Sequence, residues 1–229
     1  MENSSRSDIA YQALRRAIIE QALMPGTKLR EDEIGAHFGI SRTLVRAALL
    51  RLSQEGLVDI RRKRTATVAI PSLDEARQIF ELRHCLEQQV IHRLTAHWRP
   101  EMGEALEAHV KEEEAAARSG DTASASRLAG EFHIVLAQLA GNALLTRYLS
   151  EVVSRCSLIL AVYGRPHVAE CATAEHRGVI AALSSGDAEA SIRIMKEHLH
   201  AVEARALPKP QEADEVRISD ILARYSAAR

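Results

Sequence analysis

The sequence FGISRTLVR, residues 38–46, carries a glycine at the point where one helical pattern ends and another begins. Apolar side chains recur at helical spacing over residues 31–38, and Gly39 permits the left-handed backbone that a tight corner between two helices requires. Ser41 then offers a hydroxyl that caps a further helix, which we expect to continue to about residue 55. This pattern predicts a helix-turn-helix.

The sequence on either side of this corner completes a small domain. A first helix is expected over residues 9–19. After the third helix the periodicity becomes alternating, so residues 57–60 and 66–70 read as two short strands, with the basic run RRKR at residues 61–64 as the tip between them. We therefore predict a winged helix-turn-helix domain with a small β-hairpin wing over residues 8–71.

The remainder of the chain reads as helix after helix. Apolar residues make up 46% of the sequence and aromatic residues only 3%, a balance that favours packed helices over a sandwich or barrel. The fold class is therefore mostly α, with a C-terminal all-α antiparallel helical bundle over residues 72–206. A tail, residues 207–229, is either mobile or forms a short helix near residues 218–225. The expected bundle helices cover residues 73–97, 100–118, 121–140, 142–163, 167–184 and 187–205.

Charge is distributed unevenly between the two parts. Residues 1–71 hold 12 Lys and Arg against 8 Asp and Glu, a net charge of +4, whereas residues 72–229 hold 18 against 23, a net charge of −5. A basic patch attracts polyanions, and the first turn of a recognition helix can enter the major groove of DNA. We expect contacts to double-stranded operator DNA from Ser41, Arg42, Thr43 and Arg46 of the recognition helix and from Arg62, Lys63 and Arg64 of the wing.

Several runs in this part resemble the N-terminal half of GntR-family regulators. The chain departs from the family at Leu44, where most members have Pro, at Ala47, where most have Glu, and at Thr65, where a wing Gly is usual. The resemblance implies a winged helix-turn-helix that binds DNA, and the departures bear on operator sequence and wing geometry. The matching runs are MPGTKLRE at residues 24–31, FGISRTLVRAAL at 38–49, RL at 51–52 and EGLV at 55–58.

The helical part resembles the FadR-type branch of the same family. The C-terminal domain of that branch, the FCD domain, is a helical bundle that binds ligands, often small organic acids. With the N-terminal half included, the resemblance extends from about Asp8 to Arg205. Its markers in the bundle are FELR at residues 80–83, LE at 86–87, FH at 132–133, GN at 141–142, EH at 175–176, AL at 182–183, GD at 186–187, Met195, and HL at 198–199.

Three histidines, His133, His176 and His198, lie in three different expected helices, so only the interior of a bundle can bring them together. Neutral imidazoles gathered there are ligands for zinc, nickel or a similar divalent ion, whereas histidines that stay apart are ordinary core or surface residues. The resemblance implies a metal site, because these positions match the three histidine ligands of metal-binding members. Those members carry an Asp where this chain has Ala129, so one ligand is lost and a metal-free polar cavity is the alternative.

Arg83 is the first candidate for binding an effector, because a guanidinium can hold a carboxylate through two parallel hydrogen bonds. The alternative is an ion pair with Glu87, one helical turn away. Asn142, Arg155 and Tyr163 are further candidate effector-binding residues, although Asn142 also suits a helix cap. Arg155 and Tyr163 are candidates because their helix could line the ligand cavity.

The sequence favours a cytoplasmic regulator over an enzyme. No stretch approaches the roughly 20 apolar residues that span a bilayer, the first residues lack the apolar core of a secretory signal, and the three cysteines have no metal-binding spacing. Motifs for metalloproteases, phosphate loops and serine nucleophiles are absent. We expect a homodimeric repressor that a small organic acid releases from a pseudo-palindromic operator. The alternatives are a DNA-binding dimer whose helical domain is only structural, and a metal-dependent enzyme.

Overall fold

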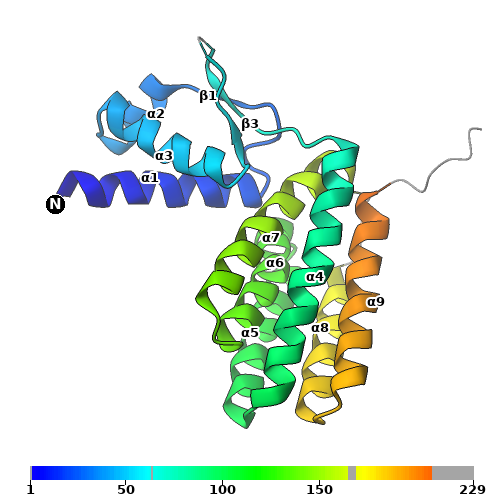
Figure 1. Ribbon diagram of the computed structural model, residues 1–229. Coiled ribbons are helices and arrows are strands. Elements are labelled where there is room, and N and C mark those ends of the chain that lie inside the picture. Colours follow the sequence, from blue (N-terminus) through cyan, green and yellow to red (C-terminus); the bar gives the residue numbers. More distant parts are fainter. Residues whose placement is uncertain (1, 63, 165–168, 208–229) are drawn as a thin grey trace, which may run out of the picture.

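The computed structural model describes residues 2–62, 64–164 and 169–207 as two packed parts (Figure 1). The N-terminal part, called the head here, contains α1 (Glu2–Ile19), β1 (Lys28–Leu29), α2 (Glu31–Phe38), α3 (Arg42–Gln54), β2 (Val58–Asp59) and β3 (Ala66–Val68). The C-terminal part, called the bundle, contains α4 (Leu73–His97), α5 (Pro100–Arg118), α6 (Thr122–Leu139), α7 (Ala143–Tyr163), α8 (Ala169–Ser184) and α9 (Ala188–Ala206). The mostly helical fold class predicted from the sequence is confirmed.

The corner between α2 and α3 depends on two glycines. Gly39 adopts a left-handed backbone with a φ of 62°, and its N–H donates to the Gly35 carbonyl. A Cβ added at Gly35 would lie 2.9 Å from the Ile40 carbonyl oxygen, closer than real Cβ contacts come. Ser41 caps α3 by accepting a hydrogen bond of 3.4 Å from the Leu44 N–H. These residues therefore produce the helix-turn-helix that the sequence predicts.

The wing belongs to a three-stranded antiparallel sheet in the order β1-β3-β2. Strands β2 and β3 form the expected hairpin, although both are shorter than the strands expected at residues 57–60 and 66–70. Strand β1 was not expected, and α1 begins several residues earlier than the sequence suggested. Residues 208–229, including the expected short helix near 218–225, lie outside the described residues.

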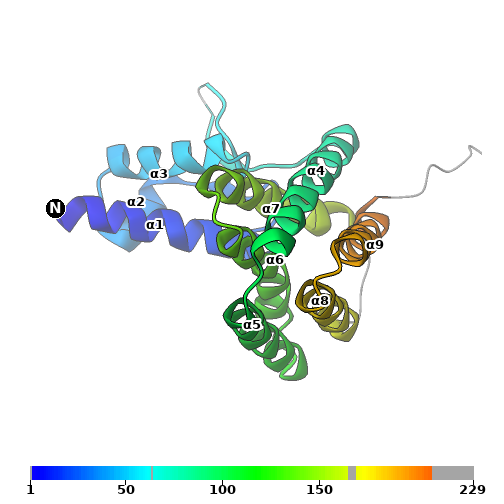
Figure 2. The same ribbon diagram turned by 60° about the horizontal axis from the view of Figure 1, so that its bottom comes forward.

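The bundle helices pack side by side around an apolar core. Helix α4 packs against α7 and α9, and α5 packs against α6 and α8 (Figure 2). The starts of α4, α6, α7 and α9 are fixed by side chains that accept a hydrogen bond from the N–H three residues later, as expected for N-caps. These caps are Ser72, Asp121, Asn142 and Asp187. Within the described ranges, none of the helices combines the length and apolar character that a membrane-spanning helix needs.

The head and the bundle meet along α7. Leu158 of α7 is 1% exposed and belongs to the apolar core of the head. One turn earlier, the Ser154 hydroxyl accepts a hydrogen bond of 2.5 Å from Arg15 of α1. Arg155, the next residue, lies against Gly56 directly after α3. Helix α7 is therefore a structural element of both parts, and a shift of α7 must disturb the head core.

Leu158→Ala tests this junction. Truncation of a fully buried leucine costs about 2–5 kcal/mol, because a cavity is left behind, and here the cavity opens in the head. We expect α3 amides to lose protection from hydrogen exchange at lower urea concentration, with a smaller change in α5. The control is Leu144→Ala on the same helix, where the side chain is 62% exposed. Equal effects of the two substitutions on α3 would contradict the assignment of Leu158 to the head core.

Candidate DNA interface and buried histidine centre

The first turn of α3 presents the polar side chains that the sequence assigns to DNA. Arg42, Thr43 and Arg46 are exposed there, beside the capping residue Ser41. Val45, between them in sequence, is fully buried in the head core. This division anchors one face of the helix and leaves its polar edge accessible to a DNA groove.

Glu31 at the start of α2 positions Arg46. The Nε atom of Arg46 lies 2.8 Å from each carboxylate oxygen of Glu31. The two side chains are 68% and 32% exposed, so the ion pair contributes little to stability. Arg46 is thereby held at the surface of the recognition helix, in an ion pair that a base edge or a phosphate can replace at little cost.

The wing carries the second group of expected DNA contacts. Arg62 and Arg64 are exposed at its tip, whereas Lys63 lies outside the described residues. The wing projects from the head away from the bundle (Figure 1). Thr65, at the position of the usual wing Gly, is also exposed. These positions are compatible with the expected contacts, which remain predictions.

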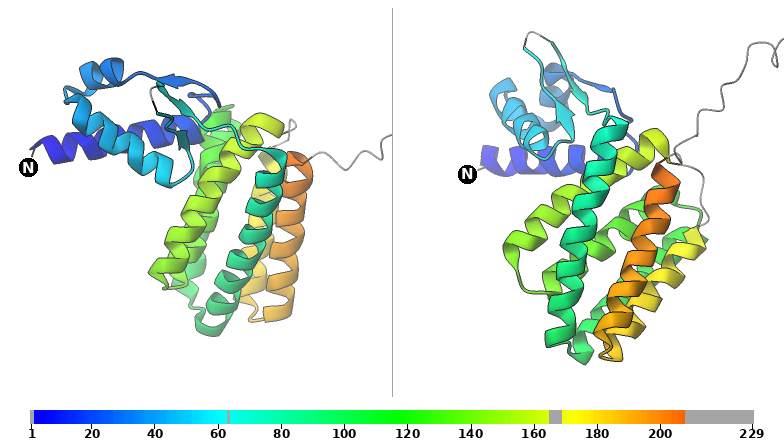
Figure 3. Two further views of the ribbon diagram at one scale, coloured as in Figure 1. Left: turned by 45° about the horizontal axis from the view of Figure 1, so that its top comes forward. Right: turned by 45° about the vertical axis from the view of Figure 1, so that its right-hand side comes forward.

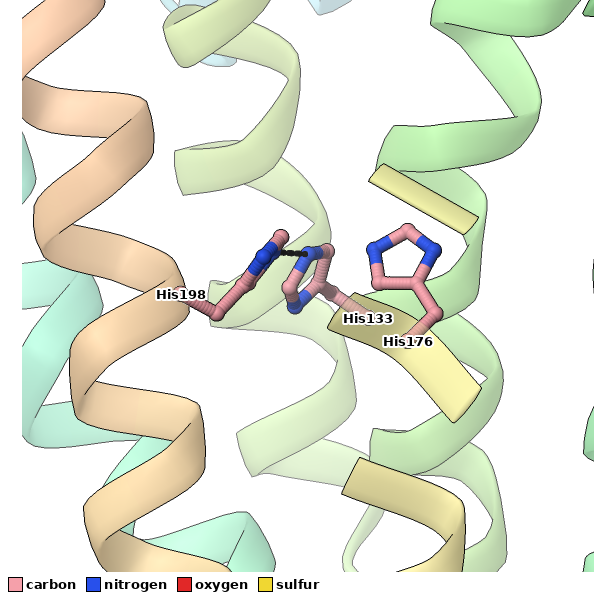
Figure 4. Close-up of side chains that lie close together, drawn as sticks. All are labelled: His133, His176 and His198. Carbon is pink, nitrogen blue, oxygen red and sulfur yellow. Dashed lines mark hydrogen bonds between the residues drawn. The ribbon is translucent and has the colours of Figure 1, made fainter. Parts of the chain in front are cut away.

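Three histidines meet inside the bundle. His133 of α6, His176 of α8 and His198 of α9 are 1%, 1% and 4% exposed, and one ring nitrogen of each lies within 4.8 Å of the others. Nε2 of His133 and Nε2 of His198 are 3.2 Å apart, the contact drawn as a dashed line in Figure 4. The Phe132 ring stacks on His176 with 4.0 Å between ring centroids. The fold thus gathers three imidazoles that are far apart in sequence.

Each of these imidazoles has a carboxylate oxygen at its Nδ1 atom. Such a partner fixes the proton on Nδ1 and leaves the lone pair on Nε2, the arrangement found in histidines that bind metals. None of the three contacts was expected from the sequence. The pairs are His133 with Glu87 at 2.5 Å, His176 with Glu113 at 2.8 Å, and His198 with Glu175 at 2.6 Å.

The three histidines offer ring nitrogens that one cation could share. Burial lowers the pKa of His133 to about 3 and lowers the pKa of His198 as well, so both rings are neutral near pH 7. The Nε2 atoms of these two rings lie 3.2 Å apart, so they can share a proton or a metal ion between them. Nε2 of His176 is buried and has no hydrogen-bond partner among the described atoms. A cation shared by these nitrogens would stabilise all three.

The donor set fits a divalent transition metal ion. Zinc–nitrogen bonds of about 2.0–2.1 Å place two tetrahedral ligand atoms roughly 3.3 Å apart, and the Nε2 atoms of His133 and His198 are 3.2 Å apart. Ala129 lies one turn before His133 on α6 and offers no ligand atom. The residues present therefore supply three nitrogens, with a remaining position open to water or an added ligand.

Arg83 takes part in this arrangement through Glu87. Its Nε lies 2.7 Å from one oxygen of Glu87, and the other oxygen of that carboxylate faces His133. Burial would raise the pKa of Glu87, but His133 and Arg83 hold it at about 2. The charge of Arg83 also acts on the thiol of Cys156 on α7, where it opposes the rise in pKa that burial causes. The ion pair that the sequence left open as the alternative is present, and binding of an effector by Arg83 remains a prediction.

The other candidate effector residues lie elsewhere. Asn142 caps α7 at one end of the bundle. Tyr163 donates a hydrogen bond of 3.0 Å to the Pro71 carbonyl, and Arg155 pairs with Glu75, so both lie where the chain passes from head to bundle. The structure does not bring these three residues to the histidines. Each of them has a hydrogen-bonding partner elsewhere in the fold. Their binding of an effector remains a prediction.

A cleft of about 290 Å³ opens between α1 and helices α5 to α7. Arg15 of the head and Arg127 of the bundle both line it. Its wall also includes His109, whose ring centroid lies 6.4 Å from that of Phe132, the residue stacked on His176. Two rings, those of His109 and Phe132, thus connect the wall of the cleft to His176.

These features define a class of protein, the winged-helix DNA-binding regulators with a helical C-terminal domain. Residues 6–68 match the family described as bacterial regulatory proteins, gntR family, and residues 78–201 match the FCD domain. The chain belongs to the GntR family, in the branch that carries an FCD domain. It is accordingly a DNA-binding transcriptional regulator and not an enzyme.

Similar proteins support this assignment. The HTH-type transcriptional repressor RspR of Escherichia coli is 28% identical over 195 residues, which cover 84% of this chain and 85% of RspR. A probable D-xylose utilization operon transcriptional repressor of Paenarthrobacter nicotinovorans is 29% identical over 203 residues, covering 86% and 88% of the two chains. The fold is also that of E. coli McbR/YncC, with a TM-score of 0.76, 19% identity and coverage of 96% and 98%.

Arg46→Ala should weaken binding to operator DNA without unfolding the head. An arginine paired with a base contributes about 1–3 kcal/mol of discrimination, so we expect a loss of roughly 10- to 100-fold in affinity. The measurement is fluorescence anisotropy at constant salt, with a DNA fragment selected by the wild-type protein. Arg193→Ala, which removes an exposed, ion-paired arginine of α9, is the control and should bind normally. Unaltered binding by Arg46→Ala would rule out this contact.

Proposed function

We propose that the protein is a homodimeric repressor whose affinity for a pseudo-palindromic operator falls when a small organic acid binds in the bundle. A DNA-binding domain over residues 8–71 reads the operator, and an effector domain over residues 72–206 binds the acid together with a divalent ion, zinc or nickel. The observation that carries the proposal is the set of three buried imidazoles, each with a carboxylate at Nδ1. The Nε2 atoms of His133 and His198 face each other, and Nε2 of His176 has no partner among the described residues.

His133, His176 and His198 are the residues that would hold the ion. When bound, the ion would supply a positive charge that attracts an oxygen of the effector carboxylate. The carboxylates at each Nδ1 orient the rings and raise the basicity of the nitrogens that face the centre. Among similar proteins, RspR is named a repressor, which supports the same sign of regulation here.

A dimer follows from the geometry of DNA reading. One recognition helix covers only a half-site, and two half-sites about one helical turn apart require two heads related by a two-fold axis. Binding of an effector changes operator affinity only if the effector binds differently to two arrangements of the heads. Contacts of α7 with both parts, through Leu158 and Ser154, support such coupling.

A thermal-shift screen against small carboxylic acids tests the effector and the ion together. An acid at about 100 times its dissociation constant stabilises by roughly 2.7 kcal/mol, which corresponds to a rise in Tm of roughly 5–10 °C for a chain of this size. We expect this rise with added zinc or nickel, and its loss after chelation and in His176→Ala. His97→Ala, an exposed histidine of α4, is the control.

The remaining outcomes of this screen contradict parts of the proposal. A rise that survives chelation would overturn the role of the ion and favour a metal-free cavity with Arg83 as the anchor. No rise with any acid would overturn the carboxylate effector and favour a helical domain that is only structural.

Glu113→Gln isolates the contribution of a carboxylate partner. The substitution keeps the size of the side chain but removes the charge that holds Nδ1 of His176. Loss of such a partner weakens metal binding by roughly 10- to 100-fold. Competition with a chromophoric chelator measures the zinc affinity, and Glu112→Gln, the exposed neighbour, is the matched control. Equal zinc affinity of the two variants would count against a metal-supporting role of Glu113.

A further inference from the structure

A second group of metal-type ligands lies at the surface of the bundle, where α4 and α9 run side by side (Figure 3). It consists of His84 of α4 and of His200 and Glu203 of α9. Their side chains are 22%, 56% and 30% exposed, so the group is open to solvent. It shares no residue with the buried histidine centre, and the sequence reading gave these residues no role.

Two imidazoles converge on one carboxylate oxygen in this group. Nε2 of His84 lies 3.3 Å from Oε2 of Glu203, and Nδ1 of His200 lies 3.5 Å from the same oxygen. The two ring centroids are 4.6 Å apart. One ligand atom from each of the three residues lies within 4.8 Å of the others. The three donors therefore surround a common point at the edge of the bundle.

Packing of the two helices fixes the positions from which these donors extend. His200 and Glu203 are three residues apart on α9 and share a face, while His84 reaches the same place from α4. Phe80 of α4 and Val202 of α9 belong to one buried apolar cluster beneath them. Side-chain rotation alone can then adjust the distances between donors, because the core holds the backbones.

We propose that His84, His200 and Glu203 form a second divalent metal site, of the zinc class, that links α4 to α9. Two imidazoles and a carboxylate are a donor set that zinc and its neighbours accept, with further positions filled by water. Calcium and magnesium prefer oxygen donors, so nitrogen from two rings selects against them. The competing explanation is a pair of ordinary His–Glu contacts, which needs no ion and gives no defined stoichiometry.

Calorimetric titration of the metal-stripped full chain with zinc chloride tests the site. The wild type should bind two zinc ions per chain, and His84→Ala/His200→Ala should bind one. The matched control is His92→Ala/His97→Ala, which removes two other exposed histidines of α4. This variant should still bind two zinc ions. In the wild type and the control, saturating zinc should raise Tm by several degrees more than in the His84/His200 variant, because the second ion adds its own stabilisation.

The two sites fail independently in this experiment. If the buried centre does not bind zinc, the wild type binds one ion, and that ion is lost in His84→Ala/His200→Ala but kept in His176→Ala. If the wild type and His84→Ala/His200→Ala bind the same number of ions with the same affinity, the surface site is overturned. Equal loss in the His92/His97 control would also overturn it, because binding would then follow the number of histidines and not their arrangement.

Discussion

The pairing of each buried imidazole with a carboxylate is the constraint on which the bundle depends. A buried charge or polar group is tolerated only when it has partners, because its transfer out of water is costly. Here the carboxylates and imidazoles come from α4, α5, α6, α8 and α9, so five helices must keep their mutual register for the pairs to survive. Apolar contacts alone would allow the helices to pack in more than one register. The pairs favour the one register in which every imidazole meets its carboxylate.

Helix α7 supplies none of these pairs, and it connects the bundle to the head. Arg83 pairs with Glu87, which holds His133, and its charge also acts on the thiol of Cys156 on α7. Leu158, further along the same helix, packs in the head core. A change at the histidine centre that moves Arg83 therefore acts on α7, and α7 contributes Leu158 to the head core. These interactions give the proposed regulation a physical route from the bundle to the head. Paired binding experiments measure the coupling between effector and operator binding.

Much of the fold follows from local signals in the sequence, and the site follows only in part. Caps such as Ser72 and Gly39 set helix ends through contacts within a few residues, so helix bounds were predictable. Strand β1 has two residues and leaves no periodic signal. Glu113 could not be found either, because it stands in a run of acids with Glu112 and Glu114 and only the tertiary packing buries it. A single sequence does not show which side chains far apart in the chain will pair in the fold.

Because residue 129 is alanine and not aspartate, the histidine centre has no carboxylate ligand at that position. Imidazole ligands give a bound divalent ion no negative charge, and the carboxylates at Nδ1 are one ring away from the ion. One of them, Glu87, is also paired with Arg83. In a buried site such an uncompensated charge favours an anionic fourth ligand over water. On the proposed function, an acid that completes the shell and the ion would then stabilise each other, since linkage makes their binding reciprocal. On that proposal, alanine at position 129 makes retention of the ion depend on the effector.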